Sequence, residues 1–379
     1  MTHSSLLPTT ADRESVLLAP YAMHSSGSRG RKHAELPHPY RGPFQRDRDR
    51  IVHSSAFRRL SGKMQVFTGD MGDYHRTRLT HTHEVASIAR TIGRALRLNE
   101  DLVEALALFH DIGHPPFGHA GEDALDECLL SHGGFSHNRY ALTIVEDLES
   151  RYPGFPGLNL TYEVLEGQAT RFDKLNAYAS DSVAPLLEVQ VVEAADSMTY
   201  DAHDTDDAVK LQLVTLDELA HLPLVREALA LVRSRYTNLR PDLLRKAVVH
   251  QLLDQQVTDV LRSSAAALAA VAELDAEQLR RSPVRIGISP GLAQQKHELE
   301  RFLYDQVYRH PRLIAVRHQA QVRLKAMFEC YLREPGRLPP RYQQRADEVG
   351  LERSIGDYLA GMTDRFCDQQ YRQMFGEGA

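Results

Sequence analysis

A stretch of twenty residues in the first third of the chain concentrates side chains that bind metal ions or move protons. It reads LALFHDIGHPPFGHAGEDAL (residues 106–125) and holds three histidines, two aspartates and one glutamate. A histidine next to a carboxylate is a frequent pair of ligands for a divalent metal ion. Because a glycine and two prolines then break the helix, the backbone can curve around a pocket. We therefore expect His110 and Asp111 to bind one metal ion at the end of the apolar run.

Two further parts of the chain carry candidate ligands for the same ion. A histidine stands at the start of a predicted helix in RTRLTHTHEVASIAR (76–90), and an aspartate stands inside another in EVQVVEAADSMTYDAHDTDDA (188–208). The expected ligands are His81, His110, Asp111 and Asp196. Two imidazoles and two carboxylates suit a hydrolytic divalent ion, with Mn or Mg preferred and Co, Ni, Fe or Zn as alternatives. For most of the 19 histidines, an ordinary core or surface position is the expectation.

The elements that would hold these side chains are helices almost throughout. One apolar face at helical spacing consists of Val85, Ile88, Ala89, Ile92 and Leu96. A second face, which leads directly into the His–Asp pair, consists of Leu102, Ala105, Leu106 and Phe109. Alternating strand patterns are scarce, and the best candidate for a strand is VRIGISP (284–290). The sequence therefore predicts an all-α protein.

The chain of 379 residues is long enough for a large core, and no glycine- or proline-rich segment is long enough to separate independent domains. We expect residues 1–42 to form a partly ordered N-terminal arm and residues 43–379 to form a single helical domain. Its core would span about residues 60–215, and residues 216–379 would form a C-terminal helical region.

A helix is expected to open at Pro43 and to run through FQRDRDRIVHSSAFRRL (44–60). Arginine and aspartate alternate in its first half. This pattern indicates a solvated, salt-bridged face, with a contact between subunits as the alternative.

Composition argues against several classes of protein. Hydrophobic residues make up 42% of the chain and charged residues 25%, which is typical of a globular protein. No stretch approaches the roughly 18 apolar residues of a membrane span, and the N-terminus lacks the pattern of a signal peptide. The three cysteines lie far apart, which disfavours a disulfide framework and fits a cytoplasmic protein. The net charge of −6 gives no support to a nucleic-acid partner, although a local basic groove stays open as an alternative.

The motifs around the proposed ligands resemble those of the bacterial dGTPase-like deoxynucleoside triphosphate triphosphohydrolases, a family of the HD-domain superfamily. The resemblance rests on RTRLTHTHEVA, HDIGHPPFGHAGEDAL, EAADSMTYDAHDTDDA and FLYDQVYRHPRL, and it extends from about residue 25 to about residue 345. It implies an HD-domain helical phosphohydrolase core with additional C-terminal helices. It also implies metal-dependent hydrolysis of a dNTP to a deoxynucleoside and inorganic tripolyphosphate, which controls the dNTP pool.

The resemblance assigns roles to residues outside the ligand set. His119 and Glu122 stand three residues apart and would face each other on one helix. In the resembling enzymes the matching pair is a catalytic dyad, which gives a proton to the departing 5′ oxygen or, alternatively, positions the attacking water. His114 and His137 match other active-site histidines of the family, and we expect both to contact phosphate oxygens.

Substrate-binding residues are expected before the first ligand in the sequence. Arg78 lies one helical turn before His81, where its guanidinium could bind phosphate oxygens in a fork. By the resemblance, Gln65 and Val66 approach the sugar and the base, where tight packing would exclude a 2′ hydroxyl.

The helix that carries Asp196 offers two more candidates. Tyr200 and Asp204 follow it at a spacing of four residues and would face the sugar ring and its 3′ hydroxyl, as matching positions do in the family. Ser197 departs from the pattern of the vertebrate relative, which has a lysine there. Loss of that cation is expected to change the phosphate contacts or to reduce the activity. The segment Tyr308-Arg309-His310 matches a recurring family segment, with phosphate binding, oligomer contact and packing as open roles.

Three functional hypotheses follow. The first is the dNTP triphosphohydrolase, and the second keeps the HD site but acts on a nucleoside monophosphate, a cyclic nucleotide or an alarmone. The third is a nucleotide-sensing or single-strand nucleic-acid-binding protein. By the resemblance we also expect a homo-oligomer, a hexamer or a tetramer. Base preference and activation by a second dNTP, as occurs in relatives, stay open.

Overall fold

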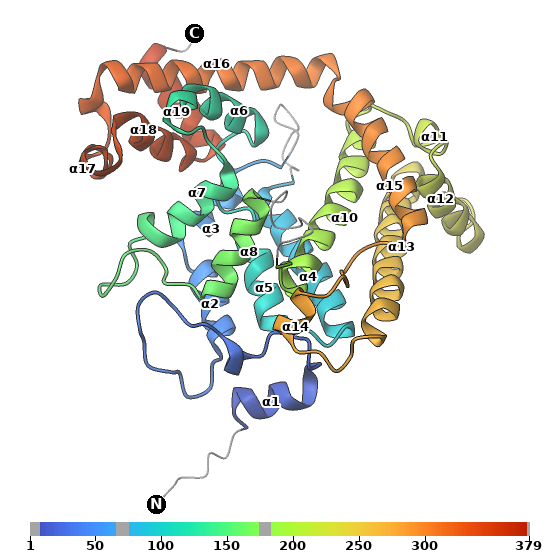
Figure 1. Cartoon of the computed structure of the whole chain (residues 1–379). Helices are drawn as coiled ribbons and strands as arrows, with labels where there is room; N and C mark the ends of the chain where they lie inside the picture. The colour runs from blue at the N-terminus through green and yellow to red at the C-terminus, as the bar shows by residue number, and fades with distance from the viewer. Residues whose placement is uncertain (1–7, 66–75, 174–182, 377–379) are drawn as a thin grey trace, which may run out of the picture.

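The computed structural model describes residues 8–65, 76–173 and 183–376, and its regular elements are helices (Figure 1). These residues include isolated β-bridges but no β-strand, which confirms the all-α prediction. The candidate strand at 284–290 does not form, because no neighbouring strand pairs with it and Pro290 already begins a helix. Its backbone bonds to a side chain instead: the Ile286 N–H donates a hydrogen bond to Gln190 Oε1 at 2.9 Å.

Three helices at the centre of the molecule carry the predicted metal ligands. They are α4 (Arg78–Ala95), α5 (Glu100–Phe109) and α10 (Leu187–Lys210). Helix α4 packs against both α5 and α10. The side chains of Thr77 and Asn99 cap the N-termini of α4 and α5 by accepting hydrogen bonds from backbone N–H groups. The predicted apolar faces lie inside, with Val85 and Phe109 fully buried, so these two helices form a rigid base for the site.

The predicted helix after Pro43 is interrupted. It forms α2 (Pro43–Val52) and α3 (Ser55–Arg59) rather than one helix, which corrects the prediction. The cause is Ser54, whose hydroxyl accepts a hydrogen bond from the Phe57 N–H and so begins a new helix.

Charged residues of α2 hold the N-terminal segment to the body of the molecule. Asp47 is fully buried, accepts hydrogen bonds from the N–H and hydroxyl of Thr161, and forms an ion pair with Arg31. Arg50 is also buried and forms an ion pair with Glu35 at 2.7 Å. The predicted solvated face is therefore wrong for Asp47 and Arg50, whose charges are neutralised inside the molecule. The proposed domain boundaries stay a prediction.

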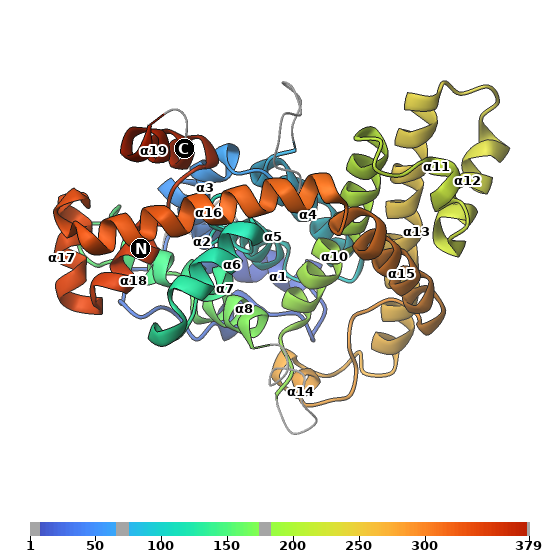
Figure 2. The ribbon, with the colours of Figure 1, turned by 90° about the horizontal axis from the view of Figure 1, so that it is seen from above.

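The long helix α16 (Pro311–Arg333) crosses the molecule and joins its C-terminal helices to the centre (Figure 2). It packs against α6 (His119–Cys128) and α19 (Asp364–Phe375). Away from these helices, α12 (Pro223–Arg235), α13 (Pro241–Ala269) and α15 (Pro290–Leu303) enclose a second apolar cluster. Since α10 packs against α13, the cluster is joined to the centre.

The remaining described α-helices have 4 to 11 residues. They are α1 (Thr10–Leu17), α7 (His137–Thr143), α8 (Tyr162–Phe172), α11 (Leu216–Leu219), α14 (Ala276–Arg280), α17 (Pro340–Val349) and α18 (Leu351–Ala360). In the described parts of the chain, no helix combines the length and the apolar character needed to cross a membrane.

Candidate active site

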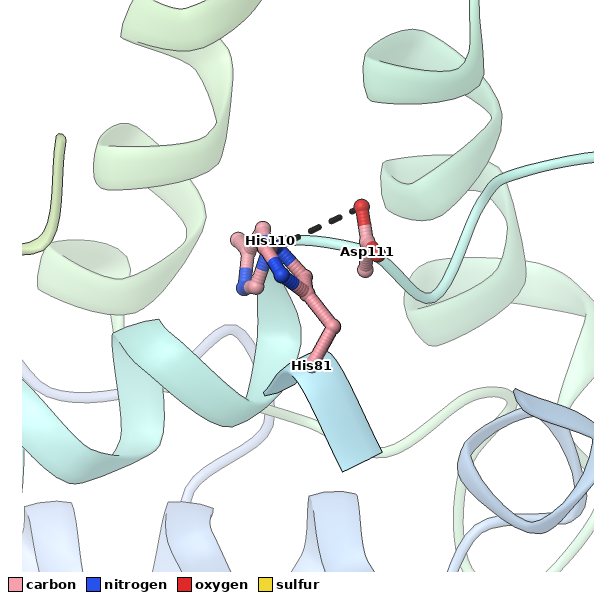
Figure 3. A group of neighbouring side chains, drawn as sticks. All are labelled: His81, His110 and Asp111. Carbon is pink, nitrogen blue, oxygen red and sulfur yellow. Dashed lines mark ion pairs between the residues drawn. The ribbon is translucent and has the colours of Figure 1, made fainter. Parts of the chain in front are cut away.

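Three of the four predicted metal ligands form a compact buried group (Figure 3). His81 lies in the first turn of α4, His110 directly follows α5, and Asp111 is the next residue. One ligand atom from each lies within 4.8 Å of the others. The packing of α4 on α5 therefore brings together residues that are far apart in the sequence.

Asp196 reaches the same point from α10. Its Oδ1 lies 3.1 Å from His81 Nε2 and 3.6 Å from His110 Nε2. Its other oxygen forms an ion pair with Arg171 of α8. Burial opposes ionisation of Asp196, but His110 and Arg171 outweigh it and hold the pKa of this carboxyl well below its usual range. The structure thus places all four predicted ligands around one point.

The hydrogen bonding of His110 fits a metal ion at this point. Its Nδ1 donates to the carbonyl oxygen of Ala107 at 2.6 Å, so the hydrogen is on Nδ1 and Nε2 keeps its lone pair. This buried Nε2 has no hydrogen-bond partner among the described residues, and burial lowers the pKa of the ring. An unpaired buried nitrogen is costly, and a cation bound by the neighbouring carboxylates would remove that cost. The four residues therefore fit a divalent metal ion.

Arg78 pairs with a proposed ligand. Its Nη1 lies 3.0 Å from Asp111 Oδ2, and its Nη2 donates to the carbonyl oxygen of Gln65 at 3.3 Å. Burial opposes ionisation of Asp111, but His114 and Arg78 outweigh it and hold its pKa well below the usual range. The Arg78 guanidinium, which was predicted to bind phosphate, thus already contacts Asp111 and Gln65. Val66, another predicted substrate-binding residue, lies outside the described residues.

A second cluster lies on α6 and α7, centred on one carboxylate. Glu122 accepts a hydrogen bond from His137 Nδ1 at 2.8 Å, and His119 Nδ1 lies 3.4 Å from its other oxygen. Burial opposes ionisation of Glu122, but the hydrogen bonds from His119 and His137 outweigh it and keep its pKa well below the usual range. The structure brings together the predicted dyad and adds His137 to it. The side chain of His119 is 50% exposed, so it is the member open to a substrate.

His114 connects the two clusters. Its Nδ1 lies 2.9 Å from Asp111 Oδ1, and its ring stacks on the ring of His137 with centroids 3.8 Å apart. One buried side chain therefore contacts both the metal group (His81, His110, Asp111 and Asp196) and the acid–base group (His119, Glu122 and His137).

A cavity of about 620 Å³ opens beside Asp196. Tyr200 and Asp204 of α10 line one wall, and Tyr304 and Tyr308 line the other, while the predicted contacts of Tyr200 and Asp204 with a sugar stay a prediction. These two tyrosines bound the π-helical turn η5 that follows α15. The Tyr308 hydroxyl donates a hydrogen bond to Asp204, which places this residue of the recurring segment in the cavity.

Two residues at the site, Arg171 and His203, were not predicted from the sequence. Arg171 stands in no recognisable motif, and its approach to Asp196 depends on the packing of α8. His203 lies behind His81, at 3.2 Å between the two Nδ1 atoms. It follows Asp196 by seven residues, which is two turns on the same helix face. This spacing could have predicted that His203 lies near the proposed metal site.

Comparison with protein families defines the class. Residues 78–201 match the HD domain, a range that contains all four proposed ligands. Residues 286–373 match the phosphohydrolase-associated domain. The chain is an HD-domain phosphohydrolase.

Full-length relatives identify the family within this class. A deoxyguanosinetriphosphate triphosphohydrolase-like protein of Ralstonia nicotianae is 41% identical over 98% of this chain and 97% of its own length. Proteins with the same description from Bordetella pertussis (42% identical, 95% of this chain, 97% of the relative) and Nitrosomonas europaea (41%, 94% and 98%) are similar. The chain therefore belongs to the bacterial dGTPase-like family, which confirms the resemblance seen in its motifs.

Proposed function

We propose that the protein hydrolyses deoxynucleoside triphosphates to a deoxynucleoside and inorganic tripolyphosphate. The observation that carries the proposal is the junction at His114, which touches Asp111 of the metal group and stacks on His137 of the acid–base group. A buried site for a cation next to a proton donor suits attack of water on a phosphorus atom with departure of an alkoxide. The names of the relatives support a nucleoside triphosphate as the substrate.

Four residues would hold the ion: His81, His110, Asp111 and Asp196. When bound there, a divalent ion stabilises charge on phosphoryl oxygens and lowers the pKa of a water molecule. Mn or Mg is our preferred ion for this ligand set.

The acid–base cluster supplies the proton. Water attacks the α-phosphorus, the bond to the 5′ oxygen breaks, and the electron pair leaves with that oxygen. His119, held by Glu122 and exposed on its other side, donates the proton that makes the 5′ hydroxyl. The proton lost by the water returns to the same imidazole, so the group is ready for another cycle. Positioning of the water by His119 is the alternative for this step.

The cavity beside Asp196 would receive the deoxynucleoside. Tyr200 offers an aromatic ring, and the Asp204 carboxyl offers a hydrogen-bond partner for the 3′ hydroxyl. We further propose that the enzyme acts in the cytoplasm, where it limits the dNTP pool, that it works as a homo-oligomer, and that a second dNTP is a candidate activator.

Product analysis tests the proposal. Purified protein is incubated with Mn²⁺ or Mg²⁺ and each dNTP, singly and in mixtures, and the products are resolved by ion-exchange chromatography. Deoxynucleoside plus tripolyphosphate supports the proposal, and activity in mixtures alone indicates an activator. Monophosphate plus pyrophosphate, or no turnover of any dNTP, contradicts it and favours another nucleotide or a binding role.

A further inference from the structure

Three polar side chains, His81, His203 and Glu84, form a hydrogen-bonded series from the proposed metal site to the edge of the molecule. His81 Nδ1 and His203 Nδ1 are 3.2 Å apart, and the other nitrogen of His203, Nε2, contacts a carboxylate oxygen of Glu84. Both imidazoles are buried, whereas the side chain of Glu84 is 47% exposed. Glu84 follows His81 by three residues, so the series begins and ends on α4.

The direction of the hydrogen bonds between these side chains determines which nitrogen of each ring carries hydrogen. An ionised carboxylate only accepts hydrogen bonds, so His203 Nε2 must be the donor to Glu84. In a neutral ring, His203 Nδ1 then has a lone pair and accepts a hydrogen bond from His81 Nδ1. This arrangement leaves His81 Nε2 without hydrogen.

The far side of His81 is where this assignment has its consequence. Its Nε2 lies 3.1 Å from Asp196 Oδ1, a distance that would be a hydrogen bond if Nε2 carried the hydrogen. In the tautomer assigned here both atoms carry lone pairs, an arrangement that a bound cation would stabilise. His110 also has an Nε2 without hydrogen, because its Nδ1 donates a hydrogen bond to the backbone carbonyl of Ala107.

We infer that Glu84 and His203 are positioning residues that hold His81 with its unprotonated Nε2 facing the metal group. A partner on the second nitrogen of a ligating histidine sets both ring orientation and tautomer. The backbone does this for His110, whereas side chains do it for His81. The inference rests on the metal site of the proposed function and does not depend on the substrate.

The first test is the tautomer of His81 in the metal-free protein, read from nitrogen-15 NMR of labelled histidine. Hydrogen on Nδ1 is expected in the wild type, and this preference should be lost in His203→Leu. Hydrogen on Nε2 in the wild type would overturn the inference, because His81 would then donate to Asp196.

The second test is Mn²⁺ affinity, measured by calorimetry. His203→Leu should weaken binding by about 10- to 100-fold. His203→Asn should recover part of it, since its Oδ1 can still accept the hydrogen bond from His81. His83→Gln, an exposed histidine on the same helix, is the matched control and should bind like the wild type.

Melting temperatures of the metal-free variants separate positioning from folding. A purely structural role would lower the melting temperature and leave the Mn²⁺ affinity of the folded protein unchanged, which would contradict the inference. If the wild type binds no metal, the proposed function fails, and the tautomer of His81 alone still decides the inference.

Discussion

The backbone N–H of Phe117 donates a hydrogen bond to Asp364 Oδ1 at 2.9 Å. Asp364 begins α19, and its other oxygen accepts a hydrogen bond from the Met64 N–H at 2.9 Å. Phe117 and Gly118 both have positive φ angles, 62° and 58°, a conformation that is costly for phenylalanine. A C-terminal helix therefore holds the strained turn that precedes His119.

We expect Asp364→Ala to lower kcat by up to about 100-fold, because a small displacement of a catalytic group is enough for such a loss. Mn²⁺ binding should change little, since Asp364 contacts none of the four proposed ligands. Steady-state kinetics and calorimetry measure the two effects. Asp368→Ala on the same helix, which removes an ion pair with Arg323, is the control. Equal kcat values for the two variants would show that the contact is dispensable.

The metal group is best tested with Asp111→Asn. Alanine at this position would leave the Arg78 guanidinium buried without its partner, which costs about 3–5 kcal/mol. Asparagine keeps a carbonyl oxygen for Arg78 but removes the negative charge. Elemental analysis should show loss of the bound metal, turnover should disappear, and circular dichroism should stay helical. Retention of a full equivalent of metal would remove Asp111 from the ligand set.

His119→Ala should lower the rate by roughly 10²–10⁴-fold, the range of general acid–base groups. Metal content and nucleotide affinity should be retained, because the ring lies outside the metal group. His132→Ala, at an exposed histidine that lies 3.7 Å from Glu352, is the control. A rate close to that of the wild type would exclude His119 from proton transfer.

Lys63 should make stability depend on pH. Its buried ammonium group donates to the carbonyl oxygens of His114 and Ala360, and burial lowers its pKa to about 7. The pKa is about 10.4 in an unfolded chain. Between these values the unfolded chain binds more protons than the folded one, so this group makes stability rise with pH and its full penalty is present below pH 7.

Melting temperatures between neutral and alkaline pH measure this effect. The difference between the wild type and Lys63→Met should grow in favour of the wild type as the pH rises. Lys325→Met, which removes a solvent-accessible lysine paired with Glu127, is the control variant. A constant difference for Lys63→Met would mean that its folded-state pKa is close to the unfolded one.

The helical fold was predictable from local apolar spacing, and the four proposed ligands were singled out by their motifs and by the resemblance to a family. Their meeting at one point depends on the packing of α4 against α5 and α10. Apolar spacing marks α4 and α5, and the His–Asp pair follows the second of these directly. Contacts between distant segments were not predictable in the same way. Arg171 and Asp364 reach the site only through the packing of α8 and α19, and no nearby motif singles out either residue. Ser54 is a residue type that often caps a helix, but the helical apolar spacing continues on both sides of it. One uninterrupted helix was therefore predicted.

The two walls of the cavity beside Asp196 differ in how freely their sequences can change during evolution. Helix α10 carries Asp196 together with Tyr200, so a shift of this wall would disturb the hydrolytic centre. The opposite wall, residues 290–308, contains none of the four proposed ligands and falls within the phosphohydrolase-associated domain. Under the proposed function, substitutions in this segment would alter how the nucleotide is held and leave the four proposed ligands in place. Divergence of substrate preference among relatives is therefore expected to concentrate on this segment.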